Sequence, residues 1–143
     1  MALVGNLGDN QRKVYEAQEA IRPWRQFDTL DEIQTWLDSL SSSNWWASRY
    51  PDITRIEATA SPSRVCSVAR QHLDEHYGII ALTPEGMNER TVLHEVAHCV
   101  APPNAKHSGA WVREFLVLTS LALGVEKYLE LYNAFSMYNV DLG

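Results

Sequence analysis

Apolar residues recur three and four positions apart along four stretches of this chain, a spacing that places them on one face of an α-helix. The clearest stretch follows Thr29, which together with Glu32 forms the sequence pattern of a capping box. Pro23 interrupts the stretch before it. The pattern predicts helices over about residues 9–21, 30–40, 109–123 and 125–137.

The middle of the chain carries shorter apolar runs that are typical of strands. Residues 53–60 alternate imperfectly between apolar and polar side chains, and residues 78–83 form an apolar run that ends at Pro84. Residues 65–73 fit either a strand or a short helix. These runs predict an α+β fold with a small mixed sheet of about three strands, packed with a central helix and with flanking N- and C-terminal helices.

A fifth helix is predicted around His94-Glu95-Val96-Ala97-His98. Asn88 is suited to cap its first turn, and Pro102 should end it near Val100. On such a helix the imidazoles of His94 and His98 lie about 40° apart on one face, one turn above the other. One nitrogen from each imidazole can then point towards a single position beside the helix.

Histidines at this spacing favour a Zn²⁺ site, because imidazole is a common zinc ligand and catalytic zinc keeps one position for water. Glu95 lies about 60° around the helix from His98, where its carboxylate reaches such a water and can act as the general base. The rest of the helix is apolar, so it should be buried except on its histidine and glutamate face. A metal ion would supply partners for these buried polar groups.

The third ligand determines the class of site. Eight residues separate His98 from His107, which is the only histidine downstream, and a loop of this length can return a side chain to the metal. Glu114 is the alternative, as a carboxylate ligand. If His107 is the ligand, Glu114 would instead hydrogen-bond a ligand histidine or pair with Arg113. Ser108 is placed to cap the helix over 109–123.

Two other groups with metal-binding chemistry are weaker candidates. His72 and His76 repeat the four-residue spacing, but their surroundings are polar and the segment can form a hairpin, which favours exposed histidines near a turn. Cys66 and Cys99 are far apart and form no metal-binding pattern, which is typical of a reducing compartment. Cys99 points about 100° away from His98 on the helix, so it is interpreted as a packing residue.

Several aromatic residues have two possible roles. Trp45 and Trp46 follow a polar break at residues 41–44 and favour a hydrophobic plug, with an aromatic wall of a substrate site as the alternative. Tyr128, Tyr132 and Tyr138 are candidates to donate a hydrogen bond to an oxyanion, although tyrosines at helical spacing are more often core residues.

Composition indicates an ordinary globular domain, with 143 residues of which 45% are hydrophobic and 21% are charged. The net charge of −6 argues against nucleic acid as a partner. The N-terminal residues do not resemble a signal peptide, and no apolar run is long enough to span a membrane. We therefore expect a single cytoplasmic domain over residues 1–143 with no membrane partner. The oligomeric state is open.

The block from His94 to His107, with its proline-containing loop and with Trp111 four residues later, resembles the active site of the zincin metallopeptidases. The whole chain resembles a family of short metallohydrolases of actinobacteria and their phages, from residues 13–17 to Phe135. That family usually has glycine directly after the third histidine, where this chain has Ser108. The resemblance implies a zinc-dependent hydrolase with a zincin-like α+β fold, in the host cytoplasm if a phage encodes it. It also implies that residues 79–83 bind an extended peptide at the sheet edge.

These residues predict a zinc-dependent hydrolase. Zn²⁺ held by His94, His98 and His107 lowers the pKa of water to about 7. Glu95 accepts the proton as this water attacks a carbonyl, and returns it to the leaving amine. A metallopeptidase acting on a peptide or protein substrate is the leading interpretation. The alternatives are a metal-dependent hydrolase of a non-peptide amide and a zinc-stabilised binding module without turnover.

Overall fold

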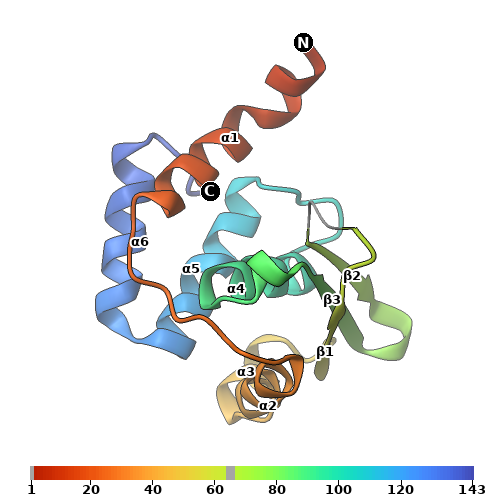
Figure 1. Cartoon of the computed structure of the whole chain (residues 1–143). Coiled ribbons are helices and arrows are strands. Elements are labelled where there is room, and N and C mark those ends of the chain that lie inside the picture. Colours follow the sequence, from red (N-terminus) through yellow and green to blue (C-terminus); the bar gives the residue numbers. More distant parts are fainter. Residues whose placement is uncertain (1, 64–66) are drawn as a thin grey trace. The chain divides into compact units, whose positions relative to one another are not determined.

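The computed structural model describes residues 2–63 and 67–143, with side chains from residue 10 onwards. The chain forms two compact units (Figure 1). Met1–Pro23 and Ala101–Gly143 form the helical unit, and Trp24–Val100 form the sheet unit. Over the described residues the fold is α+β with one three-stranded mixed sheet, as predicted. Six α-helices are described, one more than predicted, because the helix over Asn44–Arg49 was not expected. None of the described helices is long and apolar enough to cross a membrane.

The sheet unit is built on strands β1 (Arg55–Ala60), β2 (Val68–His72) and β3 (Tyr77–Leu82). β3 lies between the other two, parallel to β1 and antiparallel to β2 (Figure 1). The segment that fitted either a strand or a helix is therefore a strand from Val68 onwards. Val65 and Cys66 lie outside the described residues.

The expectation that residues 79–83 lie at a sheet edge is wrong. Ile80 in β3 pairs with Ala58 of β1 on one side and with Ala69 of β2 on the other. Both edges of β3 are therefore occupied by ladder hydrogen bonds, and an added peptide strand has no backbone groups to pair with. The apolar run of β3 explains its central place, because an uninterrupted apolar run is typical of a central strand that is buried on both faces.

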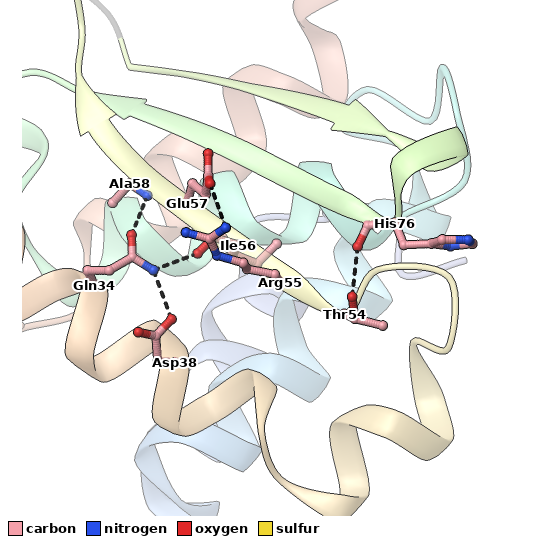
Figure 2. A network of polar contacts seen from close by, with 8 residues as sticks. All are labelled: Gln34, Asp38, Thr54, Arg55, Ile56, Glu57, Ala58 and His76. Atoms are coloured by element: carbon pink, nitrogen blue, oxygen red, sulfur yellow. Dashed lines mark hydrogen bonds and ion pairs between the residues drawn. The ribbon is translucent and has the colours of Figure 1, made fainter.

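The outer edge of β1 is covered by one side chain from α2 (Leu30–Ser41). The amide nitrogen of Gln34 donates to the carbonyl oxygen of Ile56, and its amide oxygen accepts from the backbone N–H of Ala58, both at 2.9 Å (Figure 2). The same nitrogen also donates to the carboxylate of Asp38 at 2.9 Å. Gln34 thus makes the hydrogen bonds that a neighbouring strand would make, which protects this edge from pairing.

The helices of the sheet unit follow their local signals. Thr29 caps α2 by accepting from the backbone N–H of Glu32, whose carboxylate accepts from the N–H of Asp28. In α3 (Asn44–Arg49), Trp46 is 1% exposed and its indole N–H donates to a backbone carbonyl at 2.6 Å. Trp46 therefore has the buried position predicted for a hydrophobic plug, whereas Trp45 is exposed.

The helical unit contains α1 (Ala2–Glu19), α5 (Gly109–Leu123) and α6 (Val125–Met137), and α6 packs against both of the others. α5 and α6 begin and end at the predicted residues. α1 begins seven residues earlier than predicted and ends at Glu19. Glycines at positions 5 and 8 disfavour helix in the sequence pattern and concealed this start. The three helices of this unit contribute fully buried core side chains: Val14, Ala17, Phe115, Leu118, Leu131 and Phe135.

Candidate metal centre

The helix that carries the histidine motif is α4 (Glu89–Val100), in the sheet unit. The side-chain oxygen of Asn88 accepts from the backbone N–H of Thr91 at 2.8 Å, so Asn88 caps the first turn as predicted. The helix packs against β2 and β3. Its apolar side chains are completely buried: Val92, Leu93, Val96 and Ala97. The predicted burial of the apolar side chains is confirmed, but the expected exposure of the histidine and glutamate face is wrong for His94 and Glu95, which are buried as well.

His94 and His98 are neighbours on one face of α4. Their ring centroids are 5.1 Å apart, and the rings are inclined at 67°. His94 is 3% exposed and His98 is half-buried. The four-residue spacing therefore brings the two imidazoles together within a single helical turn, as the sequence predicts.

Glu95, between the two histidines, is 6% exposed. Burial disfavours its ionised form and raises the pKa of its carboxyl group from the ordinary 4.5 to about 7. A group with this pKa exists in both protonation states near neutral pH and is well suited to accept and return a proton.

Cys99, one turn after Glu95, is a packing residue as predicted. Its thiol donates weakly to the backbone carbonyls of Arg70 and Ile79, at S···O distances of 3.7 and 3.9 Å. Burial, and then the negative charge of Glu95, raise the pKa of the Cys99 thiol to about 12. Among the described residues, Cys99 is not part of the group of side chains that could hold a metal ion.

His107 lies in the loop between α4 and α5, within the helical unit. Two consecutive turns shape this loop: the N–H of Ala105 donates to the carbonyl of Pro102 at 3.1 Å, and the N–H of Ser108 donates to that of Ala105 at 3.0 Å. Lys106 is in the left-handed region with φ of 52°. That conformation costs about 1–2 kcal/mol for a residue with a Cβ, so the second turn presents His107 at some conformational cost.

Contacts within the helical unit hold both the ring and the backbone of His107. Its ring centroid lies 4.7 Å from that of Trp111 and 5.7 Å from that of Tyr15 on α1. Its carbonyl oxygen accepts a hydrogen bond from the side chain of Asn10, also on α1. Burial lowers the pKa of the His107 imidazole from 6.5 to about 4. The ring is therefore neutral at physiological pH, which is the form that binds metals.

Asn10 and Tyr15 were not identified from the sequence. Asn10 is 97 positions away from His107, and no local pattern of residues marks such a contact. The apolar stripe on α1 indicated which face packs against the core, but it carries no information about the polar partners of the helix.

Among the residues that the structure describes, one group of side chains could hold a metal ion, and it consists of His94, His98 and His107. Each offers one ligand atom, and these atoms lie within 4.8 Å of one another. Glu114, the alternative ligand, is half-buried on α5 and is not part of this group.

The other histidine pair does not form a metal site. His72 ends β2 and His76 follows a short 3₁₀ turn, η1 (Leu73–Glu75), so the segment is the hairpin that was considered as an alternative to a helix. The ring of His72 stacks on that of Tyr77 with centroids 4.7 Å apart. His76 is exposed, with its Nδ1 3.3 Å from the carbonyl oxygen of Asp52.

The remaining candidates lie on α6 or at the ends of α5 and α6. Ser108 occupies the N-cap position of α5, but its side chain makes no capping hydrogen bond. Tyr132 on α6 and Tyr138 directly after it are exposed, and the rings of Tyr128 and Tyr132 are 6.1 Å apart. These positions do not assign a hydrogen-bonding role to any of the three tyrosines.

Three imidazoles are a donor set that fits zinc. No protein-family model matches this chain, and neither a curated protein nor a solved structure gives a significant match.

Proposed function

We propose that this protein is a zinc-dependent hydrolase and, more specifically, a metallopeptidase of the zincin type. The observation that carries the proposal is the group formed by His94, His98 and His107, whose ligand atoms lie within 4.8 Å of one another. Three protein ligands are the number that a catalytic zinc site uses, whereas structural zinc sites are closed by four. Bound zinc supplies a Lewis acid that polarises a carbonyl group and lowers the pKa of water to about 7.

Glu95 is the general acid and base of the proposed reaction. Its carboxylate accepts the proton of the attacking water and then returns that proton to the leaving amine. The raised pKa of about 7 supports this role, because a carboxylate whose conjugate acid has a higher pKa is a stronger base and accepts the proton of water more readily. The burial that raises the pKa also keeps bulk water away from the carboxylate.

The sheet supports a peptide as the substrate. An extended peptide binds to a sheet by pairing its backbone with an edge strand. Gln34 already occupies the edge of β1, and β3 is central. β2 is the other edge strand and packs against α4, which carries two of the proposed ligands and the proposed base. We infer that the substrate backbone pairs with β2.

Metal analysis tests the first part of the proposal. The protein should be prepared without a histidine tag, and zinc per chain measured for the wild type, His107→Ala and His76→Ala. We expect about one zinc ion per chain in the wild type and a large loss in His107→Ala. His76→Ala is the matched control, because it removes a histidine from the hairpin and should keep the zinc. Equal zinc in His107→Ala and the wild type would refute the three-histidine site.

Cleavage of a broad peptide library tests the catalytic part. Glu95→Gln should keep its zinc and lose cleavage by about 100-fold or more, since a general base contributes about 10²–10⁴-fold. Glu85→Gln is the control, because Glu85 is exposed in the 3₁₀ turn η2 (Pro84–Gly86) and should leave cleavage unchanged. Undiminished cleavage by Glu95→Gln would contradict the assigned base. Zinc binding without any cleavage would instead favour a binding module.

A further inference from the structure

Asn10 connects two segments that are far from it in the sequence. Its amide nitrogen donates to the backbone carbonyl of His107, and its amide oxygen accepts from the backbone N–H of Asp141 at 2.7 Å. Because a carbonyl oxygen can only accept and a backbone N–H can only donate, these two partners determine which way the Asn10 amide points. The side chain is half-buried, and its hydrogen bond to His107 is partly shielded from water, whereas its hydrogen bond with Asp141 is exposed.

Residues 141–143 also lie against the start of α5. The backbone N–H of Gly143 donates to the carboxylate of Asp141 at 2.9 Å. Gly143 also lies directly against Gly109, where an added methyl group would clash with the Gly143 backbone. Gly109 is thus required for close approach, two residues after His107.

The peptide group of His107 is consequently held from outside its own loop. The loop itself contributes the two turns, one of which depends on the left-handed conformation of Lys106. A hydrogen bond to the His107 carbonyl fixes the plane of the following peptide bond and so restricts the direction in which the imidazole leaves the backbone. The rings of Tyr15 and Trp111 then limit the rotation of the imidazole.

We propose that Asn10 is a positioning residue for the third metal ligand, and that its amide holds the His107 backbone in the orientation that metal binding requires. This inference rests on the proposed function, since it takes His107 to be a ligand. A ligand that is already oriented loses less conformational freedom when it binds the metal, so affinity is higher. Asparagine is suited to this position because its amide donates and accepts at once.

Two variants separate the two hydrogen bonds of Asn10, and a third is the control. Asn10→Ala removes both. Asn10→Asp can still accept from the N–H of Asp141 but, when ionised, cannot donate to His107. Asp141→Ala keeps the backbone N–H that Asn10 accepts from and is the matched control. Circular dichroism and urea unfolding of the metal-free proteins establish that all three are folded.

The first readout is zinc affinity, measured by competition with a chromophoric chelator. We expect Asn10→Ala and Asn10→Asp each to weaken zinc binding by about tenfold, the lower end of the effect of residues that orient metal ligands. Asp141→Ala should stay within about twofold of the wild type, since the bond between Asn10 and His107 is intact. The visible absorption of the Co²⁺-substituted protein should change in the two Asn10 variants and not in Asp141→Ala.

A double-mutant cycle shows whether Asn10 acts through His107. In the His107→Ala background, Asn10→Ala should cause no further loss of the residual zinc affinity. A similar loss in both backgrounds would mean that Asn10 affects the fold and not the ligand, and it would overturn the inference.

The outcomes for the two proposals are distinguishable. Wild-type protein that binds zinc, with Asn10→Ala and Asn10→Asp binding it equally well, overturns the role of Asn10 alone. Wild-type protein without stoichiometric zinc overturns both. A protein that binds zinc but cleaves no peptide overturns only the peptidase assignment, because neither zinc affinity nor Co²⁺ absorption requires turnover.

Discussion

His94 and His98 are placed by a single buried helix, whereas His107 is placed by contacts between segments that are distant in sequence. On α4, helical periodicity alone sets the two imidazoles side by side, and the apolar faces of the helix anchor it on the sheet. The His107 loop has no such regularity. It relies on two turns, on the ring of Trp111 and on Asn10 and Tyr15 from α1.

This difference indicates how each part of the site responds to change. A substitution on α4 that leaves the helix packed should leave the His94–His98 pair in place, because neighbouring turns maintain the geometry. The orientation of His107 should respond to the loss of the Asn10 side chain on α1, although α1 carries no ligand. The four predictions below test this contrast through the free energy of unfolding.

The largest effect should come from zinc. At a free zinc concentration about 1,000 times its Kd, the free energy of unfolding of the wild type should rise by about 4 kcal/mol, because zinc binds the folded chain preferentially. His98→Ala and His107→Ala should both lose most of this gain in urea unfolding measured with and without zinc, and His76→Ala should keep it. If His107→Ala alone kept the gain, the site would consist of the helix without the loop.

The second effect concerns Glu95 on the helix side, in metal-free protein. Its folded pKa of about 7 lies above the unfolded value of 4.5, so the folded state holds this proton more tightly. The associated stability is fully present below about pH 4.5 and is lost as the pH rises to 7, a loss of about 3 kcal/mol. Glu95→Gln stays neutral, so it should be more stable than the wild type at pH 8 by up to this amount.

Urea unfolding of both proteins at pH 4.5 and pH 8 checks this prediction, with exposed Glu85→Gln as the control. A difference between wild type and Glu95→Gln that does not depend on pH would show that burial does not shift the pKa of Glu95.

The third effect tests the packing beneath α4. A methyl group at position 78 of β3 would lie 2.8 Å from the sulfur of Cys99. Gly78→Ala should therefore reduce the free energy of unfolding by about 2 kcal/mol. The double variant Gly78→Ala/Cys99→Ala should regain only part of the loss, because it removes the sulfur but keeps the Cβ of residue 99, which would lie 2.9 Å from the methyl group. Chemical denaturation of the three proteins measures this, and a Gly78→Ala protein as stable as the wild type would contradict it.

The smallest effect is expected in the loop. Lys106→Gly removes the cost of a left-handed residue with a Cβ, about 1–2 kcal/mol, but gives the unfolded chain more freedom, worth about 1 kcal/mol. A net stabilisation of about 0.5 kcal/mol should result. Lys106→Ala keeps the unfavourable conformation and should not stabilise the protein in the same urea titration. Destabilisation by Lys106→Gly would indicate that the Lys106 side chain stabilises the folded state by more than its left-handed conformation costs.

The elements that could be predicted from the sequence are those with local signals at both ends. α4 has Asn88 at its start and Pro102 after its end, and α5 and α6 have the predicted bounds. Where the local signal was weak, the prediction failed, as it did for the start of α1. The place of β3 at the centre of the sheet depends on which strands pair with it, and the apolar run of residues 78–83 did not by itself identify those partners.

By itself the sequence determined that two histidines and a glutamate share one buried helix, because helical geometry relates residues that are three and four positions apart. It also identified His107 as a candidate, from its residue type and its distance along the chain. Only the tertiary structure decided that Asn10 holds the backbone of His107, that Gln34 covers β1 and that β3 is central. These contacts join residues tens of positions apart, and they exist only because the folded core brings their backbones within hydrogen-bonding distance.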